Sequence, residues 1–206
     1  PNIYDGWIAG DDQITDKVID HFASNLKIIS KWGSGIDSID LNYCESMRII
    51  VKNSPGAFAD AVGEMAVAYT LALTRGIVDT HNKVKEGKWP KNQYKTLSQS
   101  KVGFIGMGHI GKAAARRLES MVGSIHYNDP TVSVKNYEKL NLNELLNISD
   151  IVILTCDLNE STYKLINSSN ISLLKENAFL INVSRGHVVE EEALIKSLKE
   201  SKIAGA

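Results

Sequence analysis

The chain has 206 residues, of which 43% are hydrophobic and 23% are charged, and its formal net charge is −1. This length and apolar content suit one or two packed domains and exclude a disordered chain. A charge near zero disfavours a dedicated nucleic-acid binder. The sequence shows no signal peptide and no uninterrupted apolar run of the ~18 residues that cross a bilayer. Two cysteines, Cys44 and Cys156, are too few for a disulfide scaffold. We expect a soluble, cytoplasmic protein without a membrane or nucleic-acid partner.

The first 74 residues alternate between short apolar runs and segments of helical period. Strands are predicted at 6–10, 26–30 and 48–51, with a helix at 15–24 between the first two. A long helix follows at 59–73. Because it is apolar on every face, we expect it to be buried, either where it joins two lobes or in a subunit interface. The polar run 83–99 is predicted to be a surface linker.

The segment from residue 101 onward alternates strand and helix at a regular pitch. Strands are predicted at 101–105, 124–128, 150–155 and 177–183, and a further one begins at 202. Helices are predicted at 109–122, 142–148, 171–175 and 190–198. Such alternation indicates βαβ units with right-handed crossovers. The fold class is therefore α/β, with a doubly wound parallel sheet.

The strongest local signal is the motif G-x-G-x-x-G formed by Gly106, Gly108 and Gly111. The motif follows a predicted strand and begins a predicted helix, and Asp129 stands at the end of the next predicted strand. This is the context of a dinucleotide-binding turn. Gly106 permits the tight turn, Gly108 admits the diphosphate, and Gly111 lets helix and strand pack. Asp129 can accept hydrogen bonds from ribose hydroxyls and repel a 2′-phosphate, which favours NAD. A glycine turn in another doubly wound protein is the alternative.

Two further segments are candidate substrate sites. The glycines of 31–40 allow a ligand to approach the backbone, where exposed N–H groups could hold a carboxylate beside Lys31. The alternative is a plain strand-to-helix turn capped by Asp37. The segment 182–186 follows a strand, and Arg185 in it could clamp a carboxylate through two parallel hydrogen bonds. A surface ion pair is the alternative for this arginine.

These sites occur in the order found in a known family. The chain resembles the D-isomer-specific 2-hydroxyacid dehydrogenases, and within them it is most similar to the D-3-phosphoglycerate dehydrogenases. The matching motifs lie at 33–40, 53–56 with 61–64, 87–89, 106–111, 129–130, 149–152 and 180–186. The end of the chain, 192–194 and 202–206, also fits. Together these motifs cover essentially the whole chain.

The resemblance implies a flavodoxin-like substrate lobe, partial here, at 1–74 and a Rossmann-type NAD-binding lobe at 75–206, with the active site in the cleft between them. It implies hydride transfer between NAD and C2 of a small D-2-hydroxy or 2-oxo acid, and a homodimer. The candidate substrates are 3-phosphoglycerate, glycerate, glyoxylate and lactate. Arg185 is the expected catalytic residue, orienting the substrate, and Lys31, Ser34 and Gly35 are the expected substrate-binding residues. The residues expected to line the cofactor are Ser54, Gly106, Gly108, His109, Ile110, Gly111, Asp129, Cys156, Val183, Ser184 and Arg185. No metal ligands are expected.

The chain also departs from the family pattern. The family's catalytic carboxylate and histidine follow the strand that begins here at Lys202, so we expect the 206 residues to be a fragment lacking both termini and inactive alone. His187 follows Arg185 closely, but we interpret it as a loop histidine. Residues 155–158 differ from the family's usual His-x-Pro-Leu, which puts the contact of Cys156 with NAD in doubt. Cys156 is expected to be a small filler. A non-catalytic NAD-sensing or interaction protein on the same scaffold is the alternative function.

Overall fold

The computed structural model describes residues 4–22 and 25–206, and the chain divides into two compact units, Pro1–Phe58 and Ala59–Ala206. The predicted boundary between residues 74 and 75 falls inside the second unit. The reason is that the helix α3 (Ala59–Thr74) packs against α5 (His109–Leu118) of the second unit. The functional roles assigned to the two units remain predictions.

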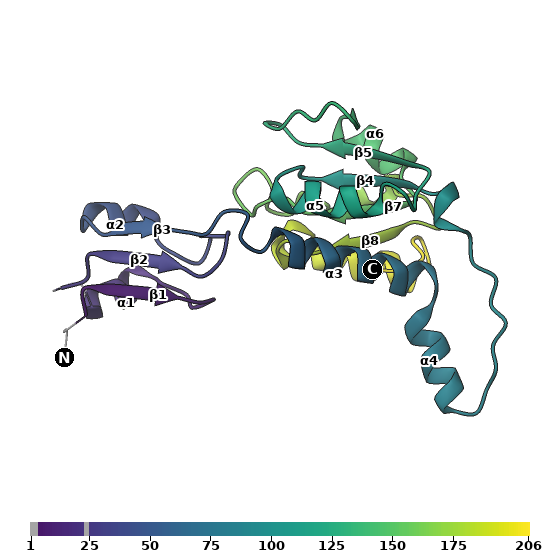
Figure 1. Ribbon diagram of the computed structural model, residues 1–206, viewed down its shortest axis with the longest axis horizontal. Coiled ribbons are helices and arrows are strands. Elements are labelled where there is room, and N and C mark those ends of the chain that lie inside the picture. The colour runs from purple at the N-terminus through teal and green to yellow at the C-terminus, as the bar shows by residue number, and fades with distance from the viewer. Residues whose placement is uncertain (1–3, 23–24) are drawn as a thin grey trace. The chain divides into compact units, whose positions relative to one another are not determined.

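The first unit is a three-stranded parallel sheet in the order β1 (Gly6–Ala9), β2 (Ile28–Lys31), β3 (Ile50–Lys52). The helices α1 (Asp16–Phe22) and α2 (Leu41–Ser46) accompany it, as the labels in Figure 1 show. All three predicted strands are confirmed within one or two residues. Residues 23 and 24 of the predicted helix lie outside the described residues. A separate core holds this unit together, formed by Ala9, Ile14, Ile19, Leu26, Ile29, Ile39, Cys44 and Ile49.

The second unit contains a five-stranded parallel sheet in the order β6-β5-β4-β7-β8. Its strands are β4 (Lys101–Ile105), β5 (Ser124–Asn128), β6 (Glu138–Lys139), β7 (Ile151–Leu154) and β8 (Phe179–Asn182). Counted within this sheet, the order is third, second, first, fourth, fifth, which is the order of a Rossmann fold. The predicted doubly wound sheet is confirmed. Strand β6 was not predicted because two charged residues carry no strand pattern.

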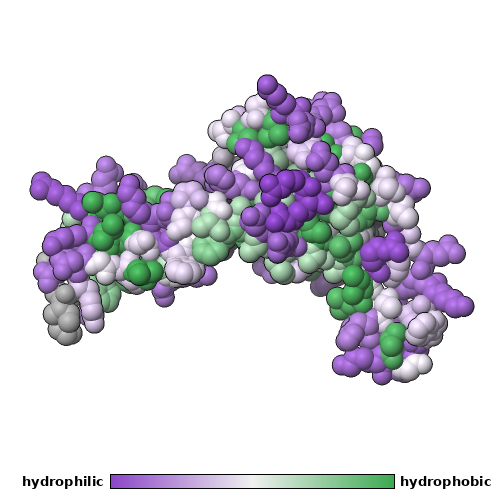
Figure 2. Space-filling view, viewed as in Figure 1, coloured by the Kyte–Doolittle hydropathy of each residue, from purple (hydrophilic) through white to green (hydrophobic). Residues whose placement is uncertain are grey.

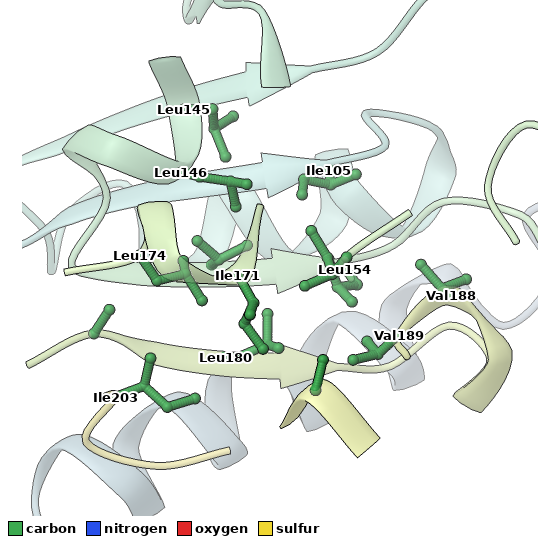
Figure 3. Close-up of a cluster of buried hydrophobic side chains, with 14 residues drawn as sticks. Ile105, Leu145, Leu146, Leu154, Ile171, Leu174, Leu180, Val188, Val189 and Ile203 are labelled. Atoms are coloured by element: carbon green, nitrogen blue, oxygen red, sulfur yellow. The ribbon is translucent and has the colours of Figure 1, made fainter. Parts of the chain in front are cut away.

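Apolar side chains fill both faces of this sheet. Val102 and Phe104 of β4 belong to one cluster, which α3 and α5 share. Ile105 belongs to the other cluster, together with Leu145 and Leu146 of α6 (Leu142–Ile148), as Figure 3 shows. Every residue of β7 is buried, as expected for a central parallel strand covered on both faces.

Helix α3 is less buried than its composition suggests. Its buried residues are Gly63, Ala66, Thr70 and Thr74, whereas the side chains of Met65 and Tyr69 are 45% and 46% exposed. The single chain therefore covers only part of the surface of α3, and burial of the rest in a subunit interface stays a prediction. Small residues face α5 because the two helices approach closely: a Cβ at Gly63 would lie 3.1 Å from the Cβ of Ala113.

A helix that the sequence did not predict lies before and at the start of the predicted linker at 83–99. Helix α4 (Ile77–Lys85) extends from the end of α3 away from the five-stranded sheet, and an irregular segment leads back to the short 3₁₀ helix η1 (Leu97–Gln99) (Figure 1). None of the residues of α4 is buried. No single helix within residues 4–22 and 25–206 is long and apolar enough to cross a membrane, and α3 with α4 passes that test only as a pair bent by 59°.

The remaining elements complete the second unit. Helix α7 (Glu191–Lys199) confirms the helix predicted at 190–198. The helix predicted at 171–175 is only a 3₁₀ turn, η2 (Ile171–Leu173), and a second such turn, η3 (Gly186–Val188), follows β8. The strand predicted from residue 202 reduces to one bridge between Phe179 and Gly205.

Candidate cofactor-binding site

The glycine motif lies where the strand order of the large sheet reverses. Strand β4 pairs with β5 on one side and β7 on the other, and ligands of open α/β sheets bind outside the carboxyl ends of strands at such a point. Gly106 follows β4 with φ of +93°, a conformation that favours glycine. A Cβ there would lie 2.6 Å from the backbone nitrogen of Cys156. Any other residue at position 106 would therefore strain the turn, both through its backbone conformation and through the collision of its Cβ with Cys156.

Gly108 and Gly111 meet different requirements. A Cβ at Gly108 would have no neighbour within 4 Å among the described residues, so this glycine borders open space in which a ligand can approach the backbone. A Cβ at Gly111 would collide with the carbonyl oxygen of Gly106, so Gly111 lets α5 start directly against the turn. The geometry at Gly106 and Gly111 agrees with the tight turn and close packing expected of a dinucleotide-binding turn, and the contact of Gly108 with a diphosphate stays a prediction.

Helix α5 begins at His109, with Gly108 as its N-cap residue and no side-chain cap in the described structure. The first N–H groups of a helix have no partner within it and carry the positive end of its dipole. His109 is exposed, and Ile110 is half-buried. The start of α5 is therefore suited to bind a diphosphate, with the His109 side chain at its outer edge.

Asp129 follows β5 and is 7% exposed. Its Oδ2 accepts a hydrogen bond from the N–H of Met107 at 2.7 Å. Its Oδ1 accepts bonds from the N–H groups of Thr131 (2.9 Å) and Val132 (2.8 Å) and from the hydroxyl of Thr131 (3.1 Å). Burial opposes ionisation, but these four bonds outweigh it and hold the pKa of Asp129 below its usual value. The side chain is an anion close to the turn and can accept from a ribose hydroxyl, since Oδ2 has one hydrogen-bond partner among the described residues.

The end of β7 closes the other side of the turn. The hydroxyl of the buried Thr155 donates to the carbonyl oxygen of Gly106 at 2.6 Å. Cys156 is half-buried, and burial raises the pKa of its thiol to about 11. This thiol is neutral at physiological pH, which agrees with the role of a filler.

Arg185 lies in a loop that follows β8, the neighbour of β7. The side chain of Asn182 shapes this loop: its Oδ1 accepts from the N–H of Ser184 at 2.9 Å, and its Nδ2 donates to the carbonyl of Arg185 at 2.8 Å. Val183 and Ser184 are half-buried, and Arg185 is exposed with Nη1 3.1 Å from the carbonyl oxygen of Ser184. His187 stacks on Tyr163 with ring centroids 6.0 Å apart.

The predicted substrate residues lie together in the first unit. Ser54 donates its N–H to the carbonyl of Gly33 at 2.9 Å, and Asn53 donates its amide to the carbonyl of Ser34 at 2.6 Å. These bonds tie the loop at 33–35 to the segment after β3. Ser34, Gly35 and Ser54 are half-buried.

Lys31, the expected cationic partner of a substrate carboxylate, already has partners of its own in the first unit. It is 3% exposed; its ammonium donates to the carbonyl of Gly10 and lies 3.2 Å from the carboxylate of Asp11. To meet a substrate carboxylate, this ammonium would have to leave both partners.

Comparison with known proteins identifies the family. Residues 67–206 match the model of the D-isomer specific 2-hydroxyacid dehydrogenase, NAD binding domain. The chain belongs to this family. It is 40% identical over 207 residues to a glyoxylate reductase of Thermofilum pendens, covering 95% of this chain and 61% of the relative. It is 30% identical over 210 residues to a D-3-phosphoglycerate dehydrogenase of Archaeoglobus fulgidus, covering 98% of this chain and 40% of the relative.

Solved structures of dehydrogenases in this family have the same fold. A D-lactate dehydrogenase from Aquifex aeolicus, complexed with NAD and lactic acid, superposes with a TM-score of 0.93 at 27% identity. The match covers 99% of this chain and 63% of that chain. The chain thus spans about three fifths of the length of such relatives.

NAD is the cofactor of this domain family, and the residues present fit it. Gly108 leaves the backbone open, the start of α5 offers N–H donors, and Asp129 supplies a buried carboxylate. Sequence reasoning missed two residues of this site. Thr155 acts on a backbone atom of another segment, which no local pattern reveals, although its position after a buried strand could have suggested it. Asn182 bonds the backbone of Ser184 and Arg185 in its own loop, so its place two and three residues before them was a local signal.

Proposed function

We propose that the protein is an NAD-dependent oxidoreductase that moves a hydride between the cofactor and C2 of a small D-2-hydroxy or 2-oxo acid. The observation that carries this proposal is the placement of two sites along one edge of one sheet. The glycine turn follows β4, and the Arg185 loop follows β8, two strands away in the same parallel sheet. A cofactor and a carboxylate-binding arginine at neighbouring strand ends are what such a reaction requires.

Arg185 is proposed as the catalytic residue that orients the substrate. A guanidinium can hold a carboxylate through two parallel hydrogen bonds, and its charge polarises a carbonyl at C2 next to that carboxylate. NAD, when bound, accepts the hydride from C2 of the hydroxy acid or returns it to the 2-oxo acid. The hydroxyl proton leaves to a base, a role for which the family's histidine is proposed.

The proposed cofactor contacts are Ser54, Gly106, Gly108, His109, Ile110, Gly111, Asp129, Cys156, Val183, Ser184 and Arg185. Lys31, Ser34 and Gly35 are the proposed contacts of the substrate carboxylate. The relatives' names, glyoxylate reductase and D-3-phosphoglycerate dehydrogenase, keep glyoxylate and 3-phosphoglycerate as candidate substrates beside glycerate and lactate.

We also propose that the protein is a homodimer. Its support is apolar surface that the single chain leaves uncovered on α3 and α4: Met65, Tyr69, Ile77, Val78 and Val84 are each between 45% and 63% exposed. Figure 2 shows green patches among purple and white surface at the lower right, where α4 lies. A cytoplasmic location is proposed because both cysteines are free, and a net charge of −1 supports the absence of nucleic-acid and membrane partners.

The test uses the protein as its gene encodes it and follows NADH absorbance with glyoxylate, pyruvate and hydroxypyruvate. The expected result is turnover of at least one acid. Substitution Arg185→Gln should reduce kcat/KM by about 10²-fold or more, because a charged pair with the substrate is lost. NAD binding without turnover of any acid would instead favour the non-catalytic NAD-sensing alternative.

A further inference from the structure

One peptide group in the cofactor turn is held at both of its polar atoms. This group joins Gly106 to Met107. Its carbonyl oxygen accepts the hydroxyl proton of Thr155 at 2.6 Å, and its N–H donates to Oδ2 of Asp129 at 2.7 Å. Thr155 follows β7 and Asp129 follows β5. The turn after β4 is therefore hydrogen-bonded to side chains from the strands on both sides of β4.

The surroundings leave this peptide no other orientation. Gly111 packs against the carbonyl oxygen of Gly106 so closely that a Cβ would collide with it. Met107 is fully buried, and Thr155 and Asp129 are 9% and 7% exposed. Water therefore has little access to replace either bond, and a buried carbonyl or N–H that loses its partner stays unsatisfied.

The carboxylate of Asp129 is also held by its own loop. Its Oδ1 accepts three bonds from Thr131 and Val132, which fix the carboxylate on its own loop. This leaves Oδ2 directed at Met107. The carboxylate is thus a bridge between the loop after β5 and the cofactor turn, in addition to being the candidate ribose acceptor.

We propose that Thr155 and Asp129 are positioning residues that fix the Gly106–Met107 peptide and so set the direction of the N–H groups at the start of α5. The inference rests on the proposed function, because those N–H groups matter only if a diphosphate binds there. Thr155 acts through the turn rather than on the ligand. Asp129 serves two purposes, so replacing it to admit a 2′-phosphate also loosens the turn.

The first experiment compares Thr155→Val with Thr155→Ser. Valine has the shape of threonine but leaves the carbonyl of Gly106 without its donor, whereas serine keeps the hydroxyl. We expect Thr155→Val to weaken NAD binding about tenfold in calorimetric titration, because one buried hydrogen bond is lost. We expect the amide hydrogen of Met107 to exchange about tenfold faster without cofactor, and Thr155→Ser to restore both values.

The matched control is Thr70→Val in α3. Thr70 is fully buried, and its hydroxyl donates to the carbonyl of Ala66 at 2.7 Å, so the same substitution removes a buried hydroxyl hydrogen bond outside the turn. It should lower the melting temperature without changing NAD affinity or the exchange of Met107 relative to neighbouring amides. If Thr155→Val behaves like Thr70→Val, Thr155 has only a structural role and the proposal is wrong.

The second experiment tests the dual role of Asp129. In Asp129→Asn, the amide Nδ2 faces the N–H of Met107 when Oδ1 keeps its own partners, so two donors oppose each other. We expect weaker NAD binding, faster exchange of Met107, and no gain in NADP affinity. Combined with Thr155→Val, the loss should be smaller than the sum of the single losses, because both act on one peptide. Additive losses, or tight NADP binding, would contradict the proposal.

The two readouts separate this inference from the proposed function. If the unaltered chain does not bind NAD, the proposed function fails, and the exchange of Met107 still reports whether Thr155 and Asp129 hold the turn. If the chain binds NAD and Thr155→Val binds it equally well with unchanged exchange, the positioning role is wrong while the proposed function stands.

Discussion

The carboxylate of Asp129 accepts a hydrogen bond from the backbone N–H of Met107 at 2.7 Å, which joins the loop after β5 to the turn after β4. This bond makes the turn sensitive to acid. Burial alone would raise the pKa of Asp129, but the hydrogen bonds that it accepts lower it below the usual value of about 4. A carboxyl with a lowered pKa stabilises the folded state above its unfolded pKa, and this contribution is lost as pH falls through the folded pKa.

We therefore expect the melting temperature to fall below pH ~4 more steeply in the unaltered chain than in Asp129→Asn. The measurement is a thermal unfolding series between about pH 6 and pH 2 for both chains. The asparagine variant should be less stable above pH 5, and the two curves should converge in acid. Parallel curves throughout would show that Asp129 carries no such linkage.

A second prediction concerns Gly103 in the middle of β4. A Cβ there would collide with the hydroxyl of Ser149 and lie 2.6 Å from Cδ2 of Leu145, both fully buried. Gly103→Ala should therefore cost about 1–3 kcal/mol of unfolding free energy through overpacking, measured by urea denaturation. Gly186→Ala is the control, because its Cβ would have no neighbour within 4 Å among the described residues. Equal stability of the two variants would contradict this packing.

A third prediction concerns Cys156. Burial raises the pKa of its thiol to about 11, whereas an unfolded cysteine titrates near pH 8.5. In the folded chain, alkylation of Cys156 by iodoacetamide at pH 8 should therefore be slow, and its rate should still be rising at pH 10. Because the folded state keeps its proton longer, stability should fall as pH rises from about 8.5 toward 11. Mass spectrometry of the alkylated peptide checks the rate, with urea-unfolded chain as the reference; equal rates in both would contradict the raised pKa.

Much of the fold could be predicted because its signals are local. Strand β7 is an apolar run, β4 is one apart from Lys101 and Gly103, and β5 alternates the buried Ile125 and Tyr127 with half-buried neighbours. The glycine motif between β4 and α5 has a fixed spacing. Helix α4 was not predicted: it has nine residues, none of them buried, and its last three residues fall in the polar run at 83–99. The buried face of helix α3 could not be predicted, because a uniformly apolar composition does not show which faces a single chain covers.

The candidate site also contains some residues with a local sequence signal and others without one. Gly106, Gly108 and Gly111 could be assigned from spacing, since each role is a property of a missing side chain. The contact of Thr155 with Gly106 joins residues 49 positions apart, and only the pairing of β4 with β7 brings them together. The burial of Lys31 likewise depends on the backbone of Gly10, which no motif specifies.

The proposed binding of NAD by the turn from Gly106 to Gly111 depends on open backbone at Gly108. This binding is tested most directly by calorimetric titration of NAD into the unaltered chain and into Gly108→Ala. Alanine at this position meets no neighbouring atom within 4 Å among the described residues, so the melting temperature should stay within about 2 °C. We predict saturable binding by the unaltered chain and at least tenfold weaker binding by Gly108→Ala. Equal affinity of the two chains, or no binding by the unaltered one, would contradict the account.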